Sequence, residues 1–156
     1  MPVGSRSIAP YGIDRRLQHR HRGRKHRHRG RKGQTAVGLL SDIRAAFGPD
    51  DIALSVVSVM ELEHGIWRAR NAEQAAGRQT FLDDLFGAVP IHPLTFGIAR
   101  LAARIDGESR RKGIQIPFQD LVIGATALEF GYAVATSNLR HFRMVPNLTV
   151  KQYPEG

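Results

Sequence analysis

The chain has 156 residues and no cysteine, which excludes disulfides, thiolate zinc sites and cysteine nucleophiles. An apolar content of 42% at this length is enough to bury the core of one folded domain. No apolar run approaches the roughly 20 residues of a membrane span, and the basic N-terminus lacks the apolar segment of a secretory signal. We therefore expect a cytoplasmic protein with no membrane partner.

The net charge of +9 lies entirely in the first 33 residues. Residues 1–33 hold 11 Lys and Arg against one acid, Asp14, whereas residues 34–156 hold 12 basic and 13 acidic side chains. The heptapeptide HRHRGRK occurs twice in succession, over 19–25 and 26–32, without apolar periodicity. Such a tract cannot bury enough apolar surface to offset its chain entropy. We expect a disordered or aberrant segment over 1–33, with weak binding of polyanions such as RNA as a consequence.

After the basic segment, helical and strand patterns alternate. Apolar residues at helical spacing predict a helix over 37–47, and the β-branched apolar run 52–57 predicts a strand. Ser58 and Glu61 have the spacing of a capping box, so a helix is expected to begin at Ser58.

The middle of the chain continues this alternation. A helix is predicted over 72–87, followed by a short strand over 88–91 in which Pro90 favours an edge position. Thr95 is predicted to cap a long amphipathic helix. The basic triplet 110–112 near its end is favourable with the helix dipole, and an RNA-phosphate contact is the alternative interpretation.

Residues 116–143 carry the most informative pattern. Pro117 suits a first helical turn, apolar residues then recur at helical spacing, and Gly131 is placed to end the helix. The apolar run 133–136 predicts a buried parallel strand, and a last strand is predicted over 148–150. Strands separated by helices imply a three-layer α/β/α sandwich around a mostly parallel sheet of four or five strands. Asp120 and the end of the strand at Thr136 should lie where sites assemble in such sheets.

This region resembles the C-terminal half of a PIN domain, the metal-dependent ribonuclease fold, and most closely the VapC-type toxins of toxin–antitoxin pairs. The matching pieces are Asp120, the Ala-rich helix that follows it, the sequence Thr136-Ser137-Asn138, and Phe142. The sequence Glu-Leu-Glu-His-Gly from Glu61 matches an earlier motif of the same family. The resemblance thus covers a PIN-like domain over 34–156.

The resemblance also implies a first strand that ends in an acidic residue, and Asp14 at the end of residues 10–14 is the match. The apolar helix that should follow is replaced by the basic tract. One hypothesis is that residues 15–32 are out of frame relative to a functional ancestor, which the nucleotide sequence would decide.

What the resemblance implies for function is an Mg²⁺- or Mn²⁺-dependent endoribonuclease acting as the toxin of a type II toxin–antitoxin system. Its catalytic residues would be Asp14, Glu61, Asp120 and Asn138, of which Asp14 and Asp120 hold the metal, with Thr136 in support. The partners implied are an RNA substrate, a cognate antitoxin and a second copy of the chain in a homodimer. A catalytically weakened or inactive PIN-like protein that binds RNA or a partner is the alternative. His141 stands near the expected site, but a lone surface histidine is more often inert.

Overall fold

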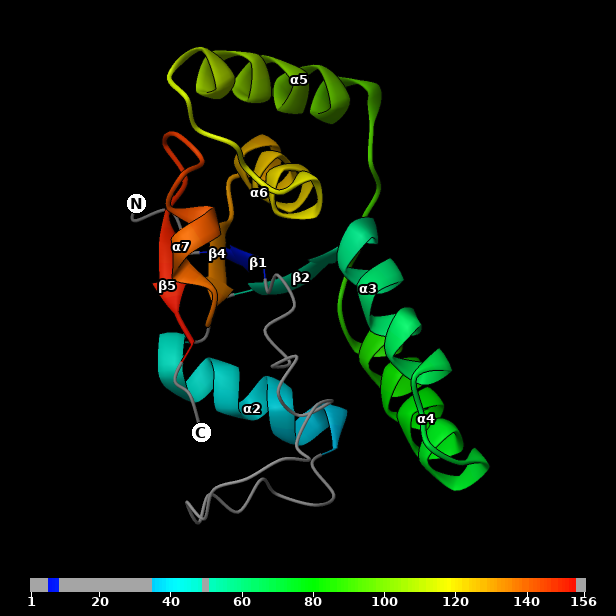
Figure 1. The fold of residues 1–156 in the computed structure, drawn as a ribbon. Coiled ribbons are helices and arrows are strands. Elements are labelled where there is room, and N and C mark those ends of the chain that lie inside the picture. Colours follow the sequence, from blue (N-terminus) through cyan, green and yellow to red (C-terminus); the bar gives the residue numbers. More distant parts are fainter. Residues whose placement is uncertain (1–5, 9–34, 49–50, 154–156) are drawn as a thin grey trace, which may run out of the picture.

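The computed structural model describes residues 6–8, 35–48 and 51–153 (Figure 1). Within these ranges, five parallel strands form a central sheet in the order β3-β2-β1-β4-β5. The strands are β1 (Arg6–Ile8), β2 (Asp51–Ser55), β3 (Ile91–His92), β4 (Ala133–Thr136) and β5 (Val150–Gln152). The helices described are α2 (Ala36–Phe47), α3 (Val56–Trp67), α4 (Ala72–Ala88), α5 (Phe96–Arg111), α6 (Phe118–Phe130) and α7 (Leu139–Phe142).

The strand at the centre of the sheet is β1, which comes from the beginning of the chain. Its Ser7 pairs with Ile52 of β2 on one side and with Ala133 of β4 on the other. Three residues of the basic segment 1–33 therefore belong to the sheet. Asp14, where the sequence placed the end of a first strand, lies outside the described residues, as does the tract over 15–32.

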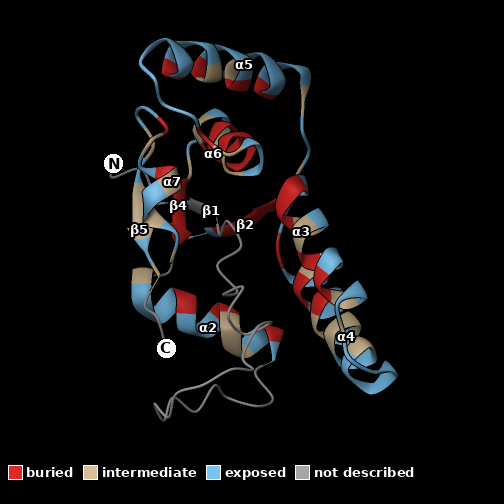
Figure 2. Ribbon diagram, viewed as in Figure 1, coloured by how far each residue is buried: buried red, intermediate tan, exposed pale blue. Residues whose placement is uncertain are grey.

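Helices cover both faces of the sheet, as the sequence predicted for an α/β/α sandwich (Figures 1 and 2). On one face, Ile52 and Leu54 of β2 pack with buried residues of α2 and α4. On the other face, Ala53 of β2 and Val134 of β4 pack against α6. Helix α5 lies on the outer side of α6 and shares a third apolar cluster with it. The alternation of sides along β2 follows from the two-residue period of a strand.

Helix α6 is the most deeply buried helix of the described part of the chain, with seven consecutive buried residues over 121–127 (Figure 2). This part of α6 is therefore buried on all sides and not only along the predicted apolar stripe, because the sheet lies on one side of α6 and α5 on the other. Pro117 immediately precedes the helix, and Gly131 ends it with a φ of 72°, in the left-handed conformation that favours glycine. Both helix ends and strand β4 agree with the sequence prediction.

The junction between β2 and α3 differs from the prediction. The strand ends at Ser55, and Ser55, not Ser58, caps the helix by accepting a hydrogen bond from the backbone N–H of Ser58. Ser58 is buried inside the first turn, so the predicted capping box between Ser58 and Glu61 is wrong. The β-branched residues Val56 and Val57 extended the strand pattern, but both lie in the helix, where Val57 packs in the core and Val56 is exposed.

Further differences are smaller, and one of them is that the strand predicted over 88–91 is β3 at Ile91–His92, with Ala88 still in α4. Val37, which the helical pattern placed on the apolar face of α2, is exposed, and Ala36 is buried instead. The last strand begins at Val150 rather than Leu148, and the short helix α7 was not predicted. In the part of the chain described here, no helix has the length and apolar character needed to cross a membrane.

Candidate functional site

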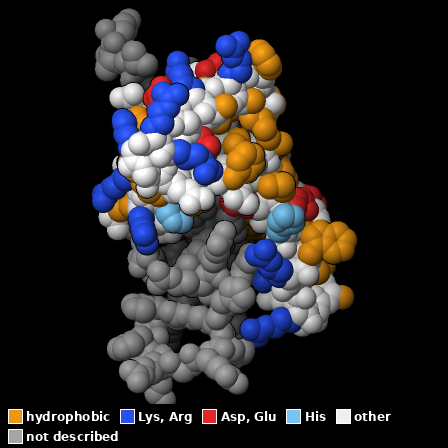
Figure 3. All heavy atoms as spheres, turned by 45° about the horizontal axis from the view of Figure 1, so that its top comes forward, with side chains coloured by type: hydrophobic (Ala, Val, Ile, Leu, Met, Phe, Trp, Pro, Cys, Tyr) orange, Lys and Arg blue, Asp and Glu red, His pale blue; other side chains and the backbone are white. Residues whose placement is uncertain are grey.

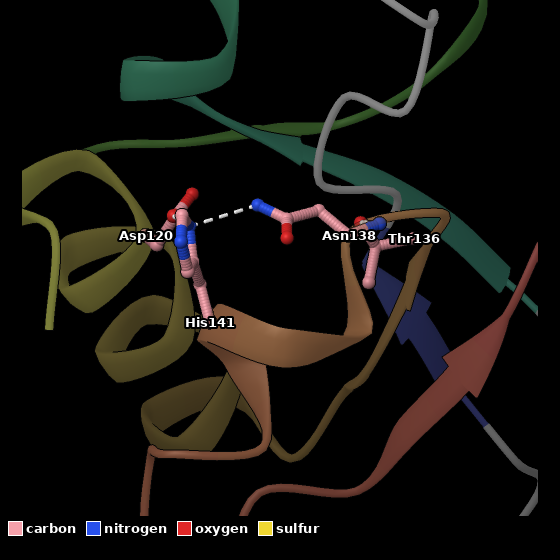
Figure 4. A network of polar contacts seen from close by, with 4 residues as sticks. All are labelled: Asp120, Thr136, Asn138 and His141. Carbon is pink, nitrogen blue, oxygen red and sulfur yellow. Dashed lines mark hydrogen bonds and ion pairs between the residues drawn. The ribbon is translucent and has the colours of Figure 1, made fainter.

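The candidate site lies where α6 begins and β4 ends, at the carboxyl edge of the sheet (Figure 4). Asp120 stands on the first turn of α6, and Thr136 is the last residue of β4. Asn138 precedes α7 as its N-cap, and His141 lies within that helix. Two predicted site residues, Asp120 and Asn138, are thus brought together with the supporting Thr136, and His141 is added to them.

Thr136 shapes the turn that carries Asn138. Its hydroxyl oxygen accepts a hydrogen bond from the backbone N–H of Asn138 at 2.9 Å, and the residue is buried. A buried hydroxyl bonded to the main chain two residues ahead holds a turn in one conformation. This bond fixes the direction in which Asn138 leaves the strand, and a supporting role of Thr136 in the site stays a prediction.

His141 joins the two other polar side chains. Its Nδ1 lies 2.7 Å from Oδ2 of Asp120 and 2.9 Å from Nδ2 of Asn138. An ionised carboxylate can only accept, so Nδ1 of His141 carries the hydrogen and donates it to Asp120. The same N–H cannot accept a hydrogen bond from the Asn138 amide nitrogen. The consistent arrangement turns that amide so that its oxygen faces the N–H of His141, which is then shared between two acceptors.

Asp120 lies at the N-terminal end of a helix and is partly shielded from water. The residue lies in the first turn of a 13-residue helix whose N-terminal N–H groups receive no side-chain cap, and the helix dipole attracts negative charge there. The side chains of Asp120 and His141 are 17% and 34% exposed, so the pair is partly shielded from water. Asp120 therefore presents a carboxyl group, as a candidate cation ligand, at the edge of the sheet.

Glu61 lies on α3, and helix spacing indicates which side of that helix it occupies. Val57 of α3 belongs to the same apolar cluster as Ile123 of α6, so the two helices pack together there. Residues four apart share one face of a helix, which places Glu61 on the side of α3 that bears Val57. By the same spacing rule Asp120 and Ile123 share a face of α6. Glu61 is half-buried, and its role in the site stays a prediction.

The oxygen atoms gathered here are of the kind that Mg²⁺ or Mn²⁺ takes as ligands: a carboxylate, an amide oxygen and a hydroxyl. Among the described residues, however, no three acidic or histidine side chains form a group able to hold a metal ion. The donor chemistry fits a hard cation, with the described residues supplying part of the shell. Asp14, the other predicted metal ligand, lies outside the described residues.

One member of the site, His141, was missed as a site residue by sequence reasoning. Its contact with Asp120 joins residues 21 positions apart, so only the fold reveals it. A local signal existed in the three-residue spacing from Asn138 to His141 across one helical turn, followed by the buried Phe142. That spacing is what brings the two side chains to one side of α7.

The surface around the site divides by chemical character. Figure 3 shows hydrophobic side chains gathered along the right of one face, with Lys and Arg side chains on its upper left and also at its lower right. Trp67 at the end of α3, Phe96 at the start of α5 and Phe118 at the start of α6 are 87%, 79% and 69% exposed. Met60, next to Glu61, is also exposed, so apolar surface reaches residues beside both carboxylates.

Comparison with known proteins agrees with the fold. The model of the PIN domain family matches residues 27–147. Over 105 residues, 67% of this chain and 78% of the relative, the chain is 27% identical to ribonuclease VapC of Rickettsia bellii. It is 34% identical to ribonuclease VapC19 of Mycobacterium tuberculosis over 99 residues, 64% of this chain and 73% of the relative.

Solved structures show the same architecture. VapBC2 from Rickettsia felis, bound to a promoter DNA fragment, superposes with a TM-score of 0.63 at 22% identity, covering 74% of this chain and 84% of that one. VapBC-5 from Mycobacterium tuberculosis superposes with a TM-score of 0.60 at 25% identity, covering 71% and 87%. The fold and the family match define a PIN domain, and the chain belongs to the PIN-domain family. Within that family, the relatives it is similar to include VapC ribonucleases.

Proposed function

We propose that this protein is an Mg²⁺- or Mn²⁺-dependent endoribonuclease that acts as the toxin of a type II toxin–antitoxin pair. The observation that carries the proposal is the placement of Asp120, Thr136 and Asn138 at the carboxyl edge of a PIN-type sheet. Similarity to VapC ribonucleases supports RNA as the substrate. Such an enzyme would act in the cytoplasm.

Each site residue would have a role that follows from its side-chain chemistry. Asp120 and Asp14 would hold the cation with their carboxylates, and Asn138 would add an amide oxygen oriented by Thr136. Glu61 would supply a further carboxylate to the reaction from α3. When bound, the cation would lower the pKa of a water molecule and neutralise charge on the scissile phosphate. Without it, clustered carboxylates would repel the phosphodiester backbone.

The experiment compares metal-dependent cleavage of RNA by the full chain and by Asp120→Asn, Asp14→Asn and Glu61→Gln. Each substitution keeps the side-chain size and removes one negative charge. A matched control is Asp106→Asn on α5, where the carboxylate pairs with Arg110 on the surface. We expect cleavage by the wild type and the control only. Cleavage by Asp120→Asn at the wild-type rate would refute the proposal.

A second candidate function is a PIN-like protein that binds RNA or a partner without cutting it. What favours it is the basic tract that stands where the family has an apolar helix after its first acidic residue. In that case the wild type and Asp120→Asn would bind RNA equally well, and neither would release fragments with Mg²⁺ or Mn²⁺. The two functions are therefore separated by the same set of variants when binding and cleavage are both measured.

The proposed antitoxin would cover the apolar surface beside the site. Trp67, Phe118 and Met60 offer exposed apolar contacts that an amphipathic segment of a partner can bury. Neighbours in the solved structures are VapBC complexes, which supports a partner of this kind. Co-expression with the product of the adjacent upstream gene should give a stable complex that Phe118→Asp weakens. A complex unaffected by substitutions at all three positions would place the interface elsewhere.

We also propose a homodimer. Phe96 at the start of α5 is 79% exposed and would be covered by a second copy of the chain in such a dimer. Light scattering coupled to size exclusion should give twice the monomer mass, and Phe96→Asp should shift it toward the monomer. A monomer at all concentrations for the wild type would remove this part of the proposal.

A further inference from the structure

We propose that His141 is a positioning residue of the metal site, which holds one oxygen of Asp120 so that the other can bind the cation. This inference rests on the proposed function, because it concerns the same carboxylate. It assigns a role to a residue that sequence reasoning treated as an inert surface histidine.

The contact is specific to one oxygen. Nδ1 of His141 lies 2.7 Å from Oδ2 of Asp120, a short distance for a hydrogen bond from nitrogen to a carboxylate. A carboxylate has two oxygens, so a hydrogen bond to Oδ2 leaves Oδ1 available as a ligand. Carboxylates that bind metals commonly accept such a hydrogen bond on the second oxygen, and the bond fixes their orientation.

The position of His141 is fixed by the residue that follows it. Phe142 is buried in the same apolar cluster as Val122 and Ile123 of α6, which anchors α7 against the helix that carries Asp120. The Asn138 amide contacts Nδ1 of His141 from the other end of α7, so the ring is held from two sides. A donor held in this way restrains Asp120 without requiring any movement of α6.

Within the described residues, the hydrogen bond from His141 is the restraint found on the Asp120 carboxylate. Helix α6 begins after Pro117, which gives no side-chain cap to the N-terminal N–H groups, and His141 is the hydrogen-bond partner assigned to the Asp120 carboxylate. Removing the imidazole should therefore let the carboxylate rotate. A ligand that must be ordered during binding lowers affinity for the metal, and loss of such a partner typically costs about 10–100-fold.

The test measures Mn²⁺ binding by calorimetry, a readout independent of RNA cleavage. His141→Phe keeps a ring of similar size and removes the donor. His141→Asn places an amide N–H near the position of Nδ1, and His141→Gln places it near Nε2, out of reach of Oδ2. Arg140→Gln, an exposed neighbour on the same short helix, is the matched control. Thermal unfolding of each variant identifies those that fold.

We expect affinity to fall about 10–100-fold in the Phe and Gln variants, to be retained in the Asn variant and to be unchanged in the control. Wild-type affinity in both the Phe and the Gln variants would overturn the inference. Tighter binding in those variants would also overturn it, since His141 would then compete with the cation. If the Phe variant does not fold, the comparison of Asn with Gln decides alone.

The proposed function fails by a different result. If the wild type binds no Mn²⁺, or if Asp120→Asn binds it as tightly as the wild type, Asp120 is not a metal ligand and the role of His141 falls with it. If Asp120→Asn abolishes binding while every His141 variant binds normally, the proposed function stands and only the inference about His141 is wrong.

Discussion

Gly124 of α6 and Val145 lie so close together that a side chain at position 124 would require Val145 to shift. A Cβ atom built on Gly124 would be 3.1 Å from Cγ2 and 3.3 Å from Cγ1 of Val145. Val145 follows α7 in the chain and is buried against α6, so this close approach helps to hold α7 beside the first turn of α6. The absence of a side chain at position 124 thus contributes to the geometry of the site.

Gly124→Ala should therefore destabilise the protein although alanine favours helices. The gain in helix propensity is about 1 kcal/mol, and crowding in a packed interior costs about 1–3 kcal/mol. We expect a net loss of about 1 kcal/mol in the free energy of unfolding, measured with urea. The control is Gly107→Ala on α5, where nothing lies within 4 Å of the added methyl group. That variant should gain up to about 1 kcal/mol. Equal effects at the two positions would contradict the packing argument.

The pH dependence of stability should be influenced by His92. Its ring stacks on Phe130 with 4.0 Å between centroids, Nε2 lies 3.2 Å from the hydroxyl oxygen of Tyr132, and burial lowers the pKa of His92 below its ordinary value of 6.5. The unfolded chain then binds this proton more readily than the folded protein does. The contribution of His92 to the free energy of unfolding is complete above the pKa that it has in the unfolded chain. That contribution is lost as the pH falls below this pKa.

The measurement compares the wild type with His92→Phe between about pH 8 and about pH 5. The variant keeps the stacking on Phe130 and removes the titrating group. The free energy of unfolding should decrease more in the wild type than in the variant as the pH falls. All other ionisable groups are the same in the two proteins, so the difference between them is the diagnostic quantity. A difference that is constant across the range would exclude a shifted His92.

The beginning of the chain should matter for stability because β1 is the central strand. Without Arg6–Ile8, the backbone groups of β2 and β4 that pair with β1 would lose their partners. Deleting residues 1–8 should abolish cooperative thermal unfolding or lower the midpoint strongly. Deleting residues 1–5 is the control, because it leaves the strand in place. An unchanged midpoint after both deletions would show that β1 does not support the sheet in solution.

The sequence predicted the C-terminal half of the fold best, for a local reason. Pro117 and Gly131 mark the ends of α6, and the short apolar run after Gly131 has the length and β-branched character of a buried strand, which β4 is. The β2–α3 junction was mispredicted because Ser55 and Ser58 are both good caps, and the β-branched residues between them suit a strand. Only burial of Ser58 against the core decides the choice, and burial is a tertiary property.

The site was predicted to the extent that its residues lie next to such local signals. Asp120 and Asn138 follow a helix start and a strand end, so their meeting at one edge of the sheet could be inferred from topology. The hydrogen bond from His141 to Asp120 depends on how α7 packs on α6. A helix of four residues has too few positions for periodicity to reveal it, so its side chains could not be assigned to the site.

The cap at the start of α3 should affect both the stability of the protein and its proposed activity, because α3 also carries Glu61. The side-chain oxygen of Ser55 accepts the backbone N–H of Ser58 at 3.0 Å and lies 3.0 Å from the hydroxyl oxygen of Ser58, with both residues buried. Ser55→Ala removes the helix cap and leaves the Ser58 hydroxyl without this partner. Loss of a cap costs about 1–2 kcal/mol, and an unpaired buried hydroxyl adds to the cost.

We therefore expect Ser55→Ala to lower the free energy of unfolding by about 2 kcal/mol. The matched control is Thr35→Ala on α2, an exposed cap bonded to Gly38 at 3.1 Å without a second hydroxyl, which should cost about 1 kcal/mol. Glu61 lies further along α3, so a loosened helix start should also reduce metal-dependent RNA cleavage in Ser55→Ala and not in Thr35→Ala. Equal losses of stability in the two variants would mean that the buried serine pair adds nothing beyond an ordinary cap. Normal cleavage by a destabilised Ser55→Ala would mean that the placement of Glu61 does not depend on this cap.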